Sequence, residues 1–388
     1  MSGRKIYMDH AATTPLREEV LSEMLPYLRE CFGNPSSIYS MGREVRKALV
    51  RARERTAEAL GASPEEVVFT SGGTESNNIA IRGALKHRGG TGHLIASGIE
   101  HPAVMDVFKE LSTEGYDVTF LPVDRYGMID IGELERALRE DTVLISIMMA
   151  NNEVGTLQPV EDVGKIAAER NIIFHTDAVQ ATGNIPVDVR KIDCDSLSLS
   201  AHKFNGPKGV GALYINRRLK VSPLYRGGGQ EGRIRPGTEN VPGIVGLGKA
   251  LELSVQDLPS RMKELAELRD CLIRGLVALD EVDLNGHPTE RLPGNVNVCF
   301  KYVEGEAILL GLDLQGVAVS SGSACASEDA EPSYVLRAMG LDHMSARGSI
   351  RFSLGRGNTP DDVEYVLGIV KPMLERFRKM SAAYIRPR

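Results

Sequence analysis

Short runs of apolar residues alternate with longer amphipathic stretches from Val67 to Ile215. The short runs have the length of buried strands, and the stretches between them carry apolar residues at helical spacing. The expected strands cover residues 67–70, 94–97, 118–121, 143–149, 172–175, 197–200 and 210–215. This alternation predicts an α/β fold with a mainly parallel sheet sandwiched by helices. Because ligands of such sheets bind at the carboxyl ends of the strands, the residues that follow each run are candidates for a site.

The flanking segments predict an arm before this sheet and a smaller domain after it. Thr14 and Pro15 favour a helix start, and a second helix is expected to end before Gly61. A long polar helix begins near Leu258, and shorter units follow it. The expected parts are an N-terminal arm over residues 1–15 associated with the small domain, a large domain over 16–257, and a small α+β domain over 258–388 with expected strands at 295–300 and 349–353.

Composition restricts the classes of partner. A length of 388 residues leaves room for one large domain and one smaller domain, each with its own core. A formal charge of -6 without a basic tract gives no electrostatic footprint for nucleic acid. No stretch approaches a membrane span, and the first residues lack the apolar run of a signal peptide. We therefore expect a cytoplasmic protein that binds small molecules and other proteins.

The five cysteines are odd in number and widely spaced, which predicts reduced thiols with neither a disulfide framework nor a zinc site. Cys194, Cys271 and Cys299 have apolar neighbours and are expected in the core. Cys325 instead lies in a stretch of small polar residues, 319–329, without periodicity. Such a stretch predicts an exposed loop, in which Cys325 is either a reactive thiol or an incidental one.

Lys203 follows the apolar run 197–200 and precedes a turn rich in glycine and proline. A lysine at the end of a buried strand is partly desolvated, which lowers its pKa and leaves a neutral amine able to form a Schiff base with an aldehyde. The alternative is an ordinary solvated lysine in a turn. The residues at the other strand ends bear on this choice.

Three other strand ends carry candidate chemistry. The glycine turn before Thr74 leads into a helix whose N-terminus would hold a phosphate, although a purely structural turn is an equal alternative. His101 could stack on a flat ring or shuttle a proton, although a lone loop histidine often does neither. Asp177 ends a buried strand and needs a positive partner, such as a protonated pyridine nitrogen.

Together these residues match the requirements of pyridoxal 5'-phosphate, which needs a lysine, a carboxylate for the ring nitrogen and a site for the phosphate. The order of glycine turn, histidine, aspartate and lysine resembles fold-type I pyridoxal phosphate enzymes of the class V aminotransferase superfamily. Longer motifs look like the cysteine desulfurases of the NifS/IscS kind, from the arm almost to the C-terminus. These motifs lie at residues 9–14, 33–37, 71–76, 177–180, 200–203, 237–240, 321–325 and 351–356.

This resemblance implies roles for single residues. Lys203 is the implied cofactor lysine, His101 assists proton transfer, and Cys325, in a loop at about 320–331, is the nucleophile that forms a persulfide. The implied contacts to the cofactor ring come from Asp177, Gln180, His101 and Asn152. The implied phosphate contacts come from Gly73, Thr74, Ser200, His202 and Thr238 of the partner subunit. The implied substrate contacts come from Asn34 and Arg351, whose guanidinium fork suits a carboxylate.

The resemblance also implies the reaction and the partners. The expected reaction converts L-cysteine to L-alanine and passes the sulfur to an iron–sulfur scaffold protein of the IscU/NifU kind or another acceptor. A homodimer is expected, without a resident metal, although Cys325 could transiently ligate a cluster held with the scaffold. Tyr39 stands where many members carry histidine, and the tail 382–388 does not resemble the longer tail that some members use for docking.

Two alternatives stay open. Another aminotransferase or lyase of the superfamily would bind the cofactor in the same way but would not need Cys325. A sulfur carrier without enzymatic activity would keep an exposed thiol but would not need Lys203 or Asp177.

Overall fold

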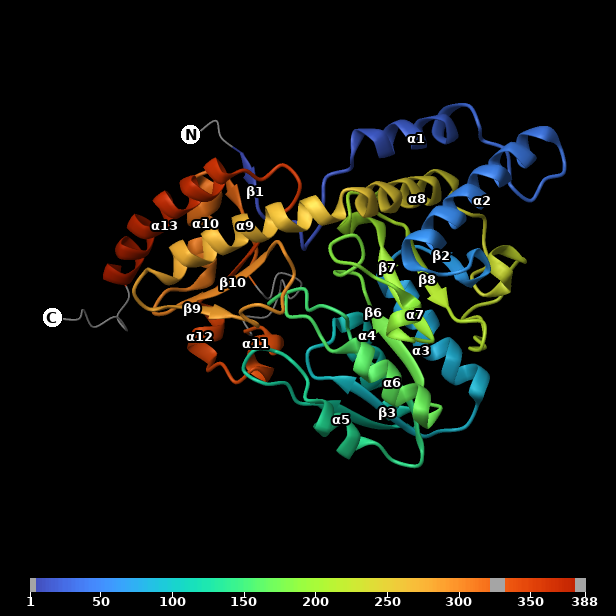
Figure 1. The fold of residues 1–388 in the computed structure, drawn as a ribbon, viewed down its shortest axis with the longest axis horizontal. Coiled ribbons are helices and arrows are strands. Elements are labelled where there is room, and N and C mark those ends of the chain that lie inside the picture. Colours follow the sequence, from blue (N-terminus) through green and yellow to red (C-terminus); the bar gives the residue numbers. More distant parts are fainter. Residues whose placement is uncertain (1–4, 322–331, 381–388) are drawn as a thin grey trace.

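The computed structural model describes residues 5–321 and 332–380, which form a large α/β lobe and a smaller lobe (Figure 1). Helix α9 (Leu258–Val277) extends from the end of α8 (Val241–Gln256) into the smaller lobe. Among the described helices, none is long and apolar enough to cross a membrane.

The large lobe contains a seven-stranded sheet in the order β2-β8-β7-β6-β5-β3-β4. Its strands are β2 (Val67–Thr70), β3 (His93–Ser97), β4 (Asp117–Leu121), β5 (Thr142–Ser146), β6 (Ile173–Asp177), β7 (Ser196–Ser200) and β8 (Gly211–Ile215). Strands β3 to β7 are mutually parallel, whereas β8 runs antiparallel to both of its neighbours. The predicted α/β fold with a mainly parallel sheet is confirmed.

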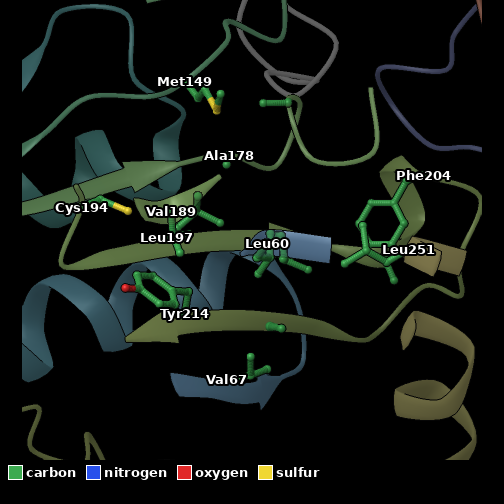
Figure 2. Packing of buried hydrophobic residues seen from close by; sticks show 14 of the residues in the cluster. Leu60, Val67, Met149, Ala178, Val189, Cys194, Leu197, Phe204, Tyr214 and Leu251 are labelled. Atoms are coloured by element: carbon green, nitrogen blue, oxygen red, sulfur yellow. The ribbon is translucent and has the colours of Figure 1, made fainter. Parts of the chain in front are cut away.

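Successive residues of these strands point to opposite faces of the sheet, and both sets are apolar. Helices therefore cover both faces. Leu94 and Ala96 of β3 pack in one cluster with α3 and α4, while Ile95 packs in another with α2 and α6. Figure 2 shows part of the second cluster, to which Leu60 of α2 and Leu197 of β7 both belong. The large-lobe helices are α1 (Glu18–Arg29), α2 (Ser40–Leu60), α3 (Gly73–Arg88), α4 (Pro102–Thr113), α5 (Ile131–Ala137), α6 (Val160–Arg170), α7 (Val189–Ile192) and α8.

The smaller lobe is built on an antiparallel sheet in the order β12-β10-β9. Its core is a separate apolar cluster that includes Leu272, Val298, Phe352 and Val366. The strands and helices are β9 (Val282–Asn285), β10 (Asn295–Phe300), β11 (Val317–Ala318), β12 (Ser349–Ser353), α10 (Gly305–Leu314), α11 (Tyr334–Ala338), α12 (His343–Arg347) and α13 (Pro360–Met380). In the arm, β1 (Ile6–Tyr7) pairs with β11 in parallel, so the arm packs with the smaller lobe.

Some local expectations differ from the structure. Helix α1 begins at Glu18 rather than near Pro15, because Thr14 bonds through its backbone and its side chain to the carbonyl of His202 and keeps this segment outside the helix. Strand β5 ends at Ser146, although the expected run continues to residue 149. The prediction that Cys271 is a core residue is wrong, because it is exposed on α9; Cys194 and Cys299 are buried as expected.

Asp257 lies at the junction of α8 and α9 and accepts hydrogen bonds from three arginines. Arg17 comes from the segment before α1, Arg261 from α9, and Arg356 from the segment after β12. One carboxylate therefore connects the large lobe with the chain that leaves the smaller sheet.

Gly164 allows α6 to lie against the end of α7. A Cβ atom at Gly164 would lie 1.8 Å from the carbonyl oxygen of Ile192, which is a backbone atom and cannot rotate away. We expect Gly164→Ala to lower the free energy of unfolding by about 3 kcal/mol, through overpacking. Gly368→Ala is the matched control, since nothing lies within 4 Å of its Cβ position, and should stabilise helix α13 by about 0.5–1 kcal/mol. Urea denaturation measures both; an unchanged Gly164→Ala midpoint would contradict the packing argument.

Candidate active site

A cavity of about 940 Å³ lies at the carboxyl ends of the large sheet, between the arm and β12. Most of the predicted site residues line it, although they come from segments far apart in the sequence. These residues are Gly73, Thr74, His101, Asn152, Asp177, Gln180, Ser200, His202, Lys203 and Arg351. The fold thus brings a lysine, a carboxylate, a helix N-terminus and a guanidinium together around one space.

Two of the described predicted site residues do not line this cavity. Asn34 and Thr238 are exposed and do not line this cavity within the chain, and Asn34 instead accepts a hydrogen bond from the backbone of Ser36 at 2.9 Å. Cys325 lies outside the described residues.

Lys203 ends the short helix η2 (Ala201–Lys203), which follows β7 directly. Its Nζ donates hydrogen bonds to the carbonyl oxygens of Ala11 at 2.7 Å and Ala12 at 2.8 Å. The Nε2 of Gln180 donates to the same Ala11 oxygen at 2.9 Å. The lysine is therefore bonded to the arm, unlike an ordinary solvated lysine in a turn.

Asp177 is the last residue of β6 and is 5% exposed. One carboxylate oxygen accepts from Nδ2 of Asn77 at 2.7 Å, and the other accepts from the backbone N–H of Val179 at 2.9 Å. These two N–H donors hold the carboxylate in place, where it suits a cationic partner. The sequence analysis missed Asn77; its only local signal was a pair of asparagines inside a helix, where asparagine has low propensity.

His101 caps the N-terminus of α4, and its Nδ1 accepts from the backbone N–H of Ala103 at 3.1 Å. Burial lowers the pKa of His101; the charge of Asp177 opposes this, and that of Lys203 adds to it. The ring is therefore neutral at neutral pH, with its hydrogen on Nε2. A neutral imidazole in this tautomer can donate one hydrogen bond into the cavity.

Helix α3 begins at Gly73, and no side chain of the described residues caps it, so the N–H groups of its first turn can bind a ligand. A Cβ atom at Gly73 would lie 2.6 Å from Cγ2 of Val179, so glycine allows close packing at this point. Ser200 and His202 line the same cavity. Burial, with the charges of Lys203 and Lys208, lowers the pKa of His202 to about 4, so this side chain contributes an N–H group rather than a charge.

Arg351 lies on β12 and is 5% exposed. Its Nη2 donates to Oδ1 of Asp9 at 2.8 Å, and its Nη1 donates to the carbonyl oxygen of Asn152 at 3.0 Å. The buried Nε has no hydrogen-bond partner in the described part of the chain. This guanidinium can donate to a further carboxylate, and Asp9, whose part the sequence analysis missed, holds it in place.

Two buried glutamates were also missed, Glu153 on the cavity wall and Glu100 beyond it. Burial raises the pKa of Glu100 to about 8, and one of its oxygens accepts from the backbone N–H of Met148 at 2.8 Å. Burial raises the pKa of Glu153 to about 7, although the hydroxyl of Ser333 and the charge of Arg351 oppose it. Each lies next to a predicted site residue in the sequence, but burial could not be read from that position.

The fold and the lysine-centred cavity define a fold-type I pyridoxal phosphate enzyme. Residues 6–366 match the class-V aminotransferase family, and the chain belongs to that family. Members of this family are pyridoxal phosphate enzymes.

Comparison with curated proteins identifies a narrower group within this class of enzymes. The chain is 54% identical over 380 residues to cysteine desulfurase IscS of Methanosarcina thermophila, covering 98% of this chain and 94% of the relative. It is 53% identical to cysteine desulfurase IscS of Dictyoglomus turgidum, covering 97% and 96%. Among solved structures, a NifS-like protein matches with a TM-score of 0.91 and 41% identity over 96% of this chain and 100% of the other. SspA in complex with cysteine matches with a TM-score of 0.80 and 39% identity over 90% and 99%. The predicted resemblance to these desulfurases is confirmed.

The raised pKa of Glu100 predicts a pH-dependent stability. Between pH 4.5, the ordinary pKa of a glutamate, and about pH 8, the folded protein holds a proton that the unfolded chain has lost, so the free energy of unfolding falls as pH rises. Glu100→Gln keeps the acceptor for Met148 and removes this titration. We expect the variant to gain up to about 4 kcal/mol relative to the parent protein between pH 5 and pH 8. Denaturation at both pH values tests this, with Glu65→Gln on the surface as control; parallel pH profiles for Glu100→Gln and the parent protein would refute it.

Proposed function

We propose that this protein is a pyridoxal phosphate-dependent cysteine desulfurase, which converts L-cysteine to L-alanine and retains the sulfur as a persulfide on Cys325. The observation that carries the proposal is the cavity in which Lys203, Asp177 and Arg351 meet. The assignment of Cys325 rests on its sequence motif.

The residues present fit the cofactor. The close approach at Gly73 and the N-terminus of α3 form a cradle for a phosphate, with Thr74, Ser200 and His202 around it. The carboxylate of Asp177 suits a protonated ring nitrogen, and Gln180 lies within the same cavity to bond the ring hydroxyl. When bound, pyridoxal phosphate supplies an aldehyde that reacts with amines and a ring that withdraws electrons from the substrate.

The remaining residues act on the substrate. The guanidinium of Arg351 binds the carboxylate of L-cysteine, and the amine of Lys203 takes the proton from Cα. The thiolate of Cys325 attacks the substrate sulfur, so that an S–S bond forms as the C–S bond breaks. His101, neutral and donating from Nε2, assists proton transfer in the cavity. In the overall reaction, L-cysteine and the thiol of Cys325 give L-alanine and the persulfide of Cys325.

Two exposed residues support a homodimer with composite sites. Thr238 and Asn34 point to a role outside their own chain's cavity, because neither lines it. Near Asn34, Phe32 is 75% exposed and Ile38 is 86% exposed, which is the apolar surface expected of an interface. The cytoplasmic location and a scaffold protein or other acceptor of the sulfur stay predictions from the sequence.

The proposed activity is tested by sulfide release and alanine formation with purified protein and L-cysteine. We expect Cys325→Ser to lose at least about 100-fold in sulfide release, because a hydroxyl cannot accept the sulfur in this way. Cys271→Ser is the matched control, since Cys271 is exposed and lies on α9 away from the cavity, and should keep full activity. Activity that survives Cys325→Ser would favour another aminotransferase or lyase, and a persulfide mapped to Cys31 would show that the nucleophile is wrongly assigned.

Composite sites are tested by mixing two inactive variants. Lys203→Ala removes the lysine, and Thr238→Glu places a carboxylate against the phosphate. If Thr238 serves the partner's site, a mixed dimer contains one site with both residues intact, so refolding the variants together should restore up to about a quarter of the parent activity for random mixing with independent sites. If Thr238 serves its own chain, every site carries one lesion and no activity returns.

A further inference from the structure

The arm forms a turn over residues 10–12 that presents two successive backbone carbonyls to one amine. Nζ of Lys203 donates to the carbonyl oxygen of Ala11 at 2.7 Å and to that of Ala12 at 2.8 Å. Successive peptide units of an extended chain face opposite ways, so their carbonyls could not converge on one nitrogen. The turn, in which the backbone N–H of Ala12 donates to the carbonyl of Asp9 at 3.0 Å, makes this convergence possible.

Two side chains hold this turn in place. The hydroxyl of Ser353 on β12, in a residue that is 4% exposed, accepts from the backbone N–H of Ala11 at 2.9 Å. The hydroxyl of Tyr7 donates to the carbonyl oxygens of Asp9 at 2.9 Å and Thr13 at 2.8 Å, on either side of the two alanines. Neither Tyr7 nor Ser353 lines the cavity of the candidate active site, so each can act on Lys203 only through the arm.

The two hydrogen bonds restrict the direction of the lone pair of Lys203. The nitrogen of a neutral lysine has four tetrahedral positions, which hold Cε, two hydrogens and the lone pair. Because Ala11 and Ala12 accept both hydrogens, the lone pair is confined to the position that remains. Attack on an aldehyde and removal of a proton from Cα both use this lone pair.

The same bonds become stronger when the amine reacts. As the lone pair of Lys203 forms an N–C bond to an aldehyde, positive charge develops on the nitrogen, and its N–H groups become better donors. The carbonyl oxygens of Ala11 and Ala12 are already in place to stabilise this charge, which speeds the step. Both hydrogens then leave with the aldehyde oxygen as water and a Schiff base forms, so the step needs no further reactant.

We propose that the turn over residues 10–12 orients the amine of Lys203 for Schiff-base formation, with Tyr7 and Ser353 as the positioning residues that hold the turn. The inference rests on the proposed function only in the role of Lys203 as the lysine that binds the cofactor. It involves neither L-cysteine nor Cys325. It gives the arm a part in the chemistry in addition to its pairing with the smaller lobe.

The decisive experiment mixes the full-length apoprotein with pyridoxal 5'-phosphate and follows the Schiff base by stopped-flow absorbance. The rate constant at saturating cofactor reports the covalent step, and its dependence on concentration reports the binding that precedes it. We expect Tyr7→Phe and Ser353→Ala each to slow the covalent step about three- to tenfold, because each removes a hydrogen bond that holds the turn. The two variants act on different parts of the turn, so the test stays open if one of them does not fold.

Each variant has a matched control with the same substitution elsewhere. Ser349→Ala lies on the same strand as Ser353, at 3% exposure, and its hydroxyl donates to the carbonyl of Ala346. Tyr116→Phe removes a hydroxyl that donates to the carbonyl of Gly90 at 2.9 Å. Neither hydroxyl contacts the arm, so both controls should keep the rate constant of the parent protein.

Pyridoxamine 5'-phosphate separates orientation of the amine from damage to the site. It offers the same ring and phosphate but has no aldehyde, so it cannot form a Schiff base with Lys203. We expect the parent protein, Tyr7→Phe and Ser353→Ala to bind it with equal affinity. Weaker binding in both variants would show that the hydroxyls only support the fold of the site, and parent-like covalent rate constants in both would show that the turn does not orient the amine; either result overturns the proposal.

Failure of this inference and failure of the proposed function give different results. A parent protein that forms the Schiff base faster than both variants, yet makes no alanine from L-cysteine, would refute the proposed reaction and leave the orientation of Lys203 intact. Alanine formation together with equal covalent rate constants in the parent and both variants would refute the orientation alone.

Discussion

The site depends on one constraint, which is that the arm must cross from the smaller sheet to the carboxyl ends of the larger one. Strand β1 of the arm pairs with β11, and the backbone N–H of Ala11 donates a hydrogen bond to the hydroxyl of Ser353 in β12 at 2.9 Å. From there it presents two carbonyl oxygens to Lys203 and a carboxylate to Arg351. A segment of a few residues thus holds the side chain of Lys203, from the large lobe, and that of Arg351, from the smaller lobe, at a fixed distance from each other.

Burial determines which side chains around the arm and the cavity carry a charge. His101, His202 and His10 all have lowered pKa values, and Glu100 and Glu153 have raised ones, so these groups in and around the cavity are neutral or close to it. The charges that remain belong to groups with several hydrogen-bond partners, such as Arg351 and Asp177. Fixed charges in a surrounding of neutral dipoles orient a zwitterionic ligand at low reorganisation cost.

Local pattern predicted much of this arrangement, and tertiary contacts account for the rest. The strand ends could be predicted because a buried strand is a continuous apolar run, so Asp177 and Lys203 were found from residues beside them in the chain. Asn77 and Asp9 were missed because their importance lies in partners 100 and 342 residues away. Cys271 was placed in the core because its neighbours are apolar, whereas its position on α9 faces outward. Thr238 and Asn34 could not be judged from one chain, whether in sequence or in structure.

The pairing of β1 with β11 has a consequence for the newly made chain. Lys203 lies in the connection between β7 and β8, an antiparallel pair formed by residues that are close in sequence. Ile6, in contrast, has no strand partner until Val317 has been synthesised, and Asp9 has no guanidinium partner until Arg351 has. During translation the segment of Lys203 is therefore complete long before its surroundings, and the arm, although it is synthesised before the strands of both sheets, is among the last segments to find its native contacts.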